Sequence, residues 1–174
     1  ELPHGEIALV LSSKTGVYAM ERAKNHGIPA VVAHRKELGD RFEAEIERYL
    51  AAYGIEMIVL AGFMSILSAD FTGRWDRRII NVHPALIPSF CGKGYWGLHV
   101  HEAALAYGVK VTGATVHYVN AIPDGGQILL QKAVDVHEGD TPEVLQRRVM
   151  EEAEWILLPR ACEMVAERIC GERK

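Results

Sequence analysis

The sequence is poor in cysteine and holds no long hydrophobic run. Its 174 residues include three widely spaced cysteines, Cys91, Cys162 and Cys170. An odd number at this spacing argues against a disulfide framework and a Cys-x-x-Cys metal knuckle, and favours reduced thiols in the cytoplasm. No apolar stretch reaches the roughly 20 residues of a membrane span, and no signal peptide opens the sequence. We therefore expect a cytoplasmic protein without a membrane partner.

A strong charge of one sign is also missing. The 19 basic and 23 acidic side chains leave a formal net charge of −4, and the basic residues lie in short scattered groups. Nucleic acid is therefore not the expected partner. The apolar share of 49% and charged share of 24% are those of a globular protein. We expect one domain over residues 1–174, a monomer or homodimer, whose partners are small molecules.

Short apolar runs alternate with helical stretches. Near-continuous apolar strands between helices predict an α/β fold with a mostly parallel, doubly wound sheet. Two long alternating segments add an antiparallel strand pair near the C-terminus. Hydroxyls at residues 12–15 are expected to cap the first helix. The expected strands are residues 6–11, 30–33, 57–61, 79–82, 110–120 and 126–137, and the expected helices are residues 17–26, 40–53, 66–75, 99–107 and 140–159, with a further helical stretch to 169.

Polar side chains stand at the end of one predicted strand. Asn81 and His83 follow the apolar pair Ile79-Ile80 and lie two residues apart, so a strand would present both on one face. Pro84 and Pro88 stop the strand and stiffen the loop beyond it. Ligands bind beyond the carboxyl ends of the strands in such sheets. This segment is therefore a candidate site, although a lone strand-end histidine is usually structural.

Asp124 lies in the connection between the last two strands, where an acidic residue is often a turn former. Asparagine, histidine and aspartate together can move a formyl or acyl group onto an amine. A protonated His83 and the Asn81 amide could hold the oxyanion of the tetrahedral intermediate. Asp124 could favour the charged imidazole or accept the amine proton through a water.

Three other motifs are weaker evidence for a functional site. His99 and His101 form a His-x-His pair, but they begin a helix, where residues two apart do not face each other, so we expect no metal site. Residues 12–16 lack both the Walker pattern and the Gly-x-Gly-x-x-Gly fingerprint. Cys91 has no base placed beside it by sequence, which argues against a nucleophile.

Four segments together resemble the family of folate-dependent phosphoribosylglycinamide formyltransferases. They are residues 61–67, 80–90, 111–119 and 123–129, and the resemblance covers nearly the whole chain in order. It implies a Rossmann-like formyltransferase fold and a catalytic trio of Asn81, His83 and Asp124. It also implies transfer of a formyl group from 10-formyltetrahydrofolate to the amine of 5-phosphoribosylglycinamide, in purine biosynthesis.

The same resemblance implies binding residues. The pterin of the folate would contact Phe63, Met64, Ile66, Leu67, Val119 and Ile122. The glycinamide substrate would contact Val82, Pro84 and Glu154. The family usually begins with a strand and a phosphate loop that have no counterpart here, and residues 6–11 match its second strand best. We therefore expect an N-terminally truncated domain, and we transfer no contacts to residues 91–100, where the chain is longer than the family's usual connection.

Two alternatives remain from the sequence. A related 10-formyltetrahydrofolate hydrolase shares several segments but has histidine at the position of Pro84, and it usually carries a further regulatory domain. The second alternative is a non-catalytic remnant that binds folate but cannot hold the acceptor, because the family's phosphate loop has no counterpart here. A tRNA-directed formyltransferase shares the core but adds a basic C-terminal domain that this sequence does not contain.

Overall fold

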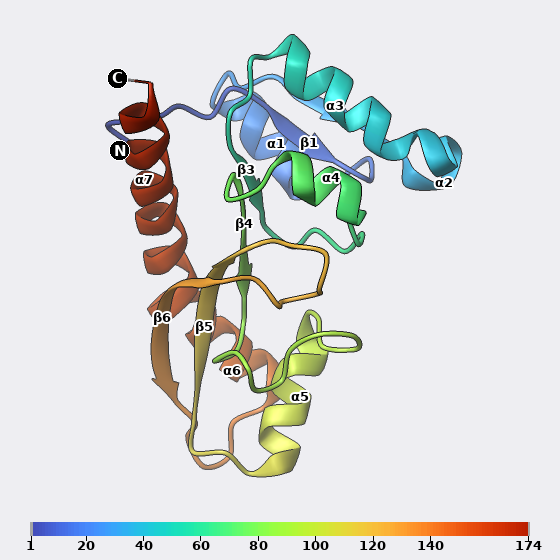
Figure 1. Cartoon of the computed structure of the whole chain (residues 1–174). Helices are drawn as coiled ribbons and strands as arrows, with labels where there is room; N and C mark the ends of the chain where they lie inside the picture. Colours follow the sequence, from blue (N-terminus) through green and yellow to red (C-terminus); the bar gives the residue numbers. More distant parts are fainter. Residues whose placement is uncertain (1, 174) are drawn as a thin grey trace. The chain divides into compact units, whose positions relative to one another are not determined.

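The computed structural model describes residues 2–173 (Figure 1). They form two compact units, one of residues 4–56 and the other of residues 57–173 with residues 2 and 3. No helix within residues 2–173 is both long and apolar enough to cross a membrane. The expectation of a single domain over residues 1–174 stays a prediction.

The smaller unit is built on a parallel strand pair, in which β1 and β2 align Val10 with Ala30. Helix α3 buries Phe42, Ile46 and Leu50, which recur every four residues and so lie on one face. Its elements are β1 (Val10–Ser12), α1 (Tyr18–Asn25), β2 (Ala30–Val32), α2 (Arg35–Leu38), the 3-10 turn η1 (Gly39–Arg41) and α3 (Phe42–Ala52).

Two expectations for the smaller unit were wrong. The first strand covers only residues 10–12, because only these residues have partners in the ladder, and Ile7 is 58% exposed. The hydroxyl of Ser12 does not cap the first helix. It accepts a hydrogen bond from the Lys14 amide at 3.1 Å and donates to the Lys14 carbonyl at 2.7 Å, while α1 begins after Val17 without a side-chain cap.

The larger unit contains a four-stranded sheet in the order β3-β4-β5-β6. The β3–β4 pair is parallel, and the β4–β5 and β5–β6 pairs are antiparallel. The elements are β3 (Ile58–Leu60), α4 (Ala69–Arg74), β4 (Ile79–His83), α5 (Leu98–Tyr107), β5 (Val111–Tyr118), β6 (Ile128–Asp135), α6 (Pro142–Val149), the π-helical turn η2 (Met150–Glu154) and α7 (Trp155–Glu172).

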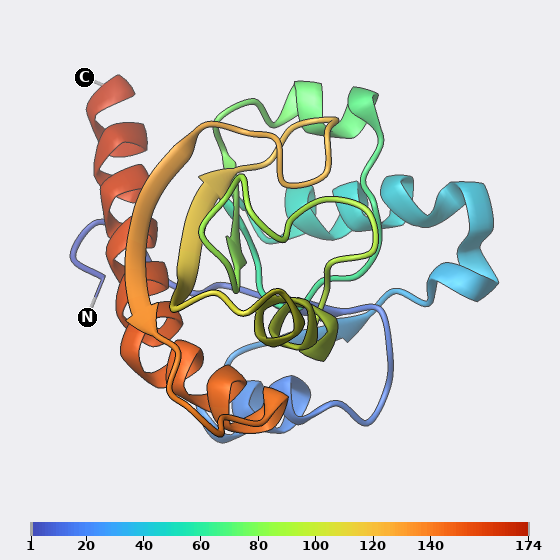
Figure 2. The ribbon, with the colours of Figure 1, turned by 90° about the horizontal axis from the view of Figure 1, so that it is seen from below.

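The core of the larger unit lies between its sheet and its C-terminal helices. In both Figure 1 and Figure 2, α7 runs beside β5 and β6. The strands contribute the fully buried side chains of Ile80, Ala114 and Val116, and α6 and α7 contribute Leu145 and Val165. This packing fixes β4 and β5, which carry the candidate site.

The α/β class with a C-terminal antiparallel pair is confirmed. Two helix boundaries differ from the expectation. Helix α4 begins at Ala69, not at residue 66, because the Ser68 hydroxyl accepts a hydrogen bond from the Phe71 amide and so caps it. Pro159 does not end a helix. It lies inside α7, in the first turns after the wide π turn η2, where the missing N–H removes only one helical bond.

Candidate active site

The C-terminal end of β4 presents Asn81 and His83. The strand is anchored by Ile79 and Ile80, which are completely buried. In the antiparallel pair with β5, Asn81 lies opposite His117 and His83 lies opposite Thr115. Neighbours opposite each other in a sheet are close enough to interact, so β5 adds a second histidine to the predicted pair.

The connection from Val119 to Gly126 brings in Asp124. The side chain of Asn120 closes this loop, because it accepts from the Ile122 amide at 2.9 Å and donates to the Gly125 carbonyl at 3.3 Å. Gly126 passes so near β5 that a Cβ there would lie 1.7 Å from the Tyr118 carbonyl oxygen. Only glycine fits this approach. Asp124 itself has a φ of 54°, in the left-handed region.

The carboxylate of Asp124 has three polar neighbours. Its Oδ2 accepts a hydrogen bond from the Gly92 amide at 2.8 Å and lies 3.6 Å from Nδ1 of His83. Its Oδ1 lies 3.6 Å from Nε2 of His117. Burial acts to raise the pKa of Asp124, but His117, the Gly92 amide and the charge of His83 outweigh it and hold that pKa below its ordinary value. The carboxylate is therefore ionised at neutral pH.

The ring of His83 is held between two acceptors and is 4% exposed. Its Nε2 lies 2.8 Å from the Phe90 carbonyl oxygen, which can only accept, so Nε2 carries a hydrogen. Its Nδ1 faces the carboxylate of Asp124. A protonated ring gives both nitrogens a matching partner, and the geometry therefore suits an imidazolium.

His117 is a site residue that the sequence analysis missed. Its Nδ1 lies 2.8 Å from the Tyr118 carbonyl oxygen, which can only accept, so Nδ1 carries a hydrogen. In the tautomer with its single hydrogen on Nδ1, Nε2 is an acceptor and lies 3.3 Å from the Asn81 amide NH₂. This contact fixes which way the Asn81 amide points. The histidine was visible in the sequence, but its pairing with Asn81 depends on strand register.

An apolar cleft of about 130 Å³ opens beside these polar groups. The predicted trio contributes Asn81 and Asp124 to its wall, and His117 joins them. Met64 is 55% exposed, and Ile66 and Ile122 are each 66% exposed, so the wall offers apolar surface to a ligand. All six residues predicted to bind the pterin line this cleft: Phe63, Met64, Ile66, Leu67, Val119 and Ile122.

The three residues predicted to contact the glycinamide substrate do not line the cleft. Val82 and Pro84 flank His83 along the chain, and both are half-buried. Glu154 is the last residue of the π turn, and burial raises its pKa above the ordinary value. The structure thus brings the residues predicted to bind the pterin together with Asn81 and Asp124. It leaves the residues predicted to contact the glycinamide substrate outside the cleft.

His101 lies completely buried in α5. Neither of its ring nitrogens has a hydrogen-bond partner among residues 2–173. Burial first, and the charge of His83 second, lower its pKa to about 4. His101 is therefore a neutral imidazole near His83, and it does not join His99 in a metal site. No group of three or more metal-binding side chains occurs in the described part of the chain.

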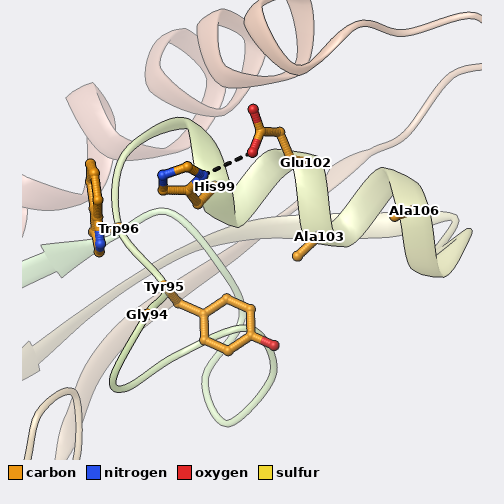
Figure 3. Close-up of a pocket in the computed structure, with 7 residues that line it drawn as sticks. All are labelled: Gly94, Tyr95, Trp96, His99, Glu102, Ala103 and Ala106. Carbon is orange, nitrogen blue, oxygen red and sulfur yellow. Dashed lines mark hydrogen bonds and ion pairs between the residues drawn. The ribbon is translucent and has the colours of Figure 1, made fainter.

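A second hollow of about 550 Å³ lies against the residue 94–96 loop and α5 (Figure 3). It is lined by Tyr95, Trp96 and one face of α5 from His99 to Ala106, and none of the predicted site residues reaches it. His99 is half-exposed here, and its Nδ1 lies 2.9 Å from the Glu102 carboxylate. His99 and Glu102 are thus paired with each other.

Comparison with known sequences reveals close relatives. The family model described as "Formyl transferase" matches residues 2–162. The trifunctional purine biosynthetic protein adenosine-3 of Gallus gallus is 44% identical over 163 residues, 92% of this chain and 16% of that protein. The chloroplastic phosphoribosylglycinamide formyltransferase of Arabidopsis thaliana is 36% identical over 98% of this chain and 58% of its own length. The chain thus spans only part of these curated relatives.

Solved structures give the same result. The phosphoribosylglycinamide formyltransferase from Anaplasma phagocytophilum superposes with a TM-score of 0.85 at 36% identity, over 95% of this chain and 76% of that one. Glycinamide ribonucleotide transformylase 1 from Symbiobacterium toebii superposes with a TM-score of 0.85 at 39% identity, over 94% and 75% of the two chains.

Proposed function

Because the chain belongs to the formyl transferase family, we propose that it transfers a formyl group from 10-formyltetrahydrofolate to the amine of 5-phosphoribosylglycinamide, in purine biosynthesis. One observation carries the proposal. The ionised carboxylate of Asp124 stands at an apolar cleft with His83, His117 and Asn81 gathered around it. Small molecules are the only partners the proposal requires.

In this reaction the amine attacks the formyl carbon, and a tetrahedral intermediate with a negative oxygen forms. We assign the stabilisation of that oxygen to the Nδ1–H of His83 and the second amide hydrogen of Asn81, whose first is taken by His117. At 3.6 Å from the carboxylate of Asp124, the Nδ1–H of His83 is not engaged in a hydrogen bond to it and is available to the new oxygen.

The remaining steps need a proton acceptor and a leaving group. The new carbon–nitrogen bond forms as the amine loses a proton, which we assign to Asp124 through a water. The bond from the formyl carbon to N10 of the folate then breaks, and N10 takes up the proton that the amine gave to Asp124 and its water. His83 donates a hydrogen bond in these steps and loses no proton.

The cleft supplies the site for the donor. Its apolar wall suits the flat pterin ring of the folate. We assign the acceptor side to Val82, Pro84 and Glu154. The support for Val82 and Pro84 is their place on either side of His83, and the support for Glu154 is the family resemblance.

The test follows tetrahydrofolate production from 10-formyltetrahydrofolate with and without phosphoribosylglycinamide. Product that depends on the acceptor supports the proposal. Acceptor-independent release of formate indicates the hydrolase instead, and folate binding without turnover indicates the inactive remnant.

Two histidine variants sharpen this test. His83→Gln, which cannot be protonated, is expected to lose turnover. His99→Gln is the matched control, because His99 is half-exposed and lies outside the cleft. Equal turnover in both variants would remove His83 from the mechanism.

A further inference from the structure

Two residues with a positive φ meet at His83. Among residues 2–173, only three non-glycine residues have a positive φ, and they are Arg77, Phe90 and Asp124. Phe90, with a φ of 48°, places its carbonyl 2.8 Å from Nε2 of His83, and Asp124, with a φ of 54°, faces Nδ1. A bulky residue in this region persists only where its surroundings hold it there.

We propose that Phe90 is a positioning residue that fixes the proton arrangement of the His83 ring, an inference that rests on the proposed function. Its carbonyl can only accept, so Nε2 must donate to it. If the ring were neutral, the Nδ1 lone pair would then face the Asp124 carboxylate. The carbonyl thus fixes a hydrogen on Nε2 and turns Nδ1 toward Asp124, on the side where the reacting oxygen is proposed to form.

Aromatic contacts hold Phe90 in this conformation. Its ring packs edge-to-face against Tyr95, with ring centres 6.1 Å apart, and against Tyr107, with ring centres 6.0 Å apart. Tyr95 belongs to the loop of Figure 3, and Tyr107 is the last residue of α5. The Phe90 backbone is therefore tied to a helix through its side chain.

The segment from Ile87 to Gly92 also holds Asp124, the second residue that faces the His83 ring. Two residues beyond Phe90, the amide of Gly92 donates to Asp124 at 2.8 Å. Before Phe90, the Ile87 amide donates to the Thr115 hydroxyl at 3.1 Å, and its carbonyl accepts from Gln131 at 3.0 Å. The segment is thus fixed to β5 and β6 on one side and to α5 on the other. A shift of Phe90 would move His83 and Asp124 relative to each other.

The test removes the aromatic support without opening the core. Tyr107 is 82% exposed, so Tyr107→Ala leaves no cavity, and Phe90→Leu removes both ring contacts while keeping an apolar side chain. Tyr18→Ala is the matched control, because Tyr18 is 70% exposed and contacts no other aromatic ring within residues 2–173. Each variant of the full chain is assayed for kcat and KM, and its histidine rings are observed by long-range ¹H–¹⁵N correlation spectra, with His83→Gln used for assignment.

We expect kcat to fall about 10-fold to 100-fold in Phe90→Leu and less in Tyr107→Ala, with KM within about 2-fold, since small misplacements at a reacting centre have effects of this size. In the wild type, His83 should keep a protonated Nε2 as the ring loses its charge, and in the variants an Nδ1–H form should appear. An unprotonated Nε2 in the wild type, or unchanged kcat and spectra in Phe90→Leu, would overturn the assignment. If the wild type transfers no formyl group, the proposed function fails, and the ring spectra still decide the role of Phe90.

Discussion

Asp124 approaches His83 to 3.6 Å without forming a hydrogen bond to it. Its firm bond is to the Gly92 amide at 2.8 Å, which fixes where the carboxylate stands. The carboxylate therefore acts on the imidazole by charge, and the ring N–H stays available to a substrate oxygen. A shorter contact would have bound that hydrogen more tightly to Asp124.

Replacement of Asp124 by asparagine tests this role of charge. Asp124→Asn keeps the shape and an oxygen that can accept from Gly92, but it removes the negative charge beside His83. We expect kcat to fall about 10²-fold to 10⁴-fold, the range of a lost acid–base group, with folate binding within a few-fold of wild type. Steady-state kinetics and calorimetric titration with a folate that carries no formyl group measure the two effects. A kcat within 3-fold of wild type would contradict the role given to the carboxylate.

His117 offers a test of how the Asn81 amide is oriented. In His117→Gln the side-chain oxygen can replace Nε2 as the acceptor for Asn81, whereas in His117→Phe the amide loses its partner. We expect His117→Phe to lower kcat by about 10-fold or more and His117→Gln to retain most of it. Thermal unfolding of both proteins separates this effect from a loss of fold. Equal activity of the two variants would show that the acceptor atom is not needed.

The apolar wall can be tested at Ile66. This side chain is 66% exposed, so Ile66→Ser should not unfold the protein. Loss of its buried area on binding should cost about 1–2 kcal/mol, which weakens folate binding roughly 5-fold to 30-fold. Turnover at saturating folate should change little. Ile156→Ser, on the outside of α7, is the control, and weaker folate binding in the control as well would argue against a specific wall.

The ion pair between Asp140 and Arg148 predicts a pH-dependent contribution to stability. Both Asp140 oxygens bind the guanidinium, at 2.5 and 2.7 Å, and this contact, aided by the His137 amide, lowers the pKa of Asp140 from 3.8 to about 2. A depressed carboxyl pKa stabilises the folded state above the unfolded-state value, and the effect is lost as pH falls through the folded-state value.

Asp140→Asn should therefore lower the free energy of unfolding by roughly 1.5–3 kcal/mol at pH 6, the range for hydrogen bonds to charged groups. The difference from wild type should shrink as the pH falls from about 4 toward 2. Urea unfolding at a series of pH values gives this comparison. A difference that stays constant over that interval would exclude the ion pair as its source.

The sequence predicted what depends on local pattern. Apolar runs located β3 and β4, and the two-residue spacing placed Asn81 and His83 on one face of β4. The family resemblance located the apolar wall and Asp124. These features depend on residue type at fixed spacing, which the amino-acid sequence gives directly.

The features that were missed depend on backbone geometry. His117 meets Asn81 only through the register of β4 and β5, which spacing does not determine. Phe90 contributes a carbonyl, which every residue has, and it adopts a conformation that its side chain disfavours. No residue preference could have located it. The hydroxyls at residues 12–15 were predicted to cap a helix because such residues are common at helix N-termini. The Ser12 hydroxyl instead forms a local turn with the backbone of Lys14.

The two positive-φ residues beside His83 also bear on how this protein can be engineered. Glycine adopts their backbone conformation without strain, so replacing Phe90 by glycine would relieve an unfavourable conformation while releasing the carbonyl that His83 donates to. The relief of strain is offset by the lost ring contacts with Tyr95 and Tyr107, so we expect such a change to show its effect in turnover more than in stability. A Phe90 variant that keeps its melting temperature should therefore still be assayed for activity.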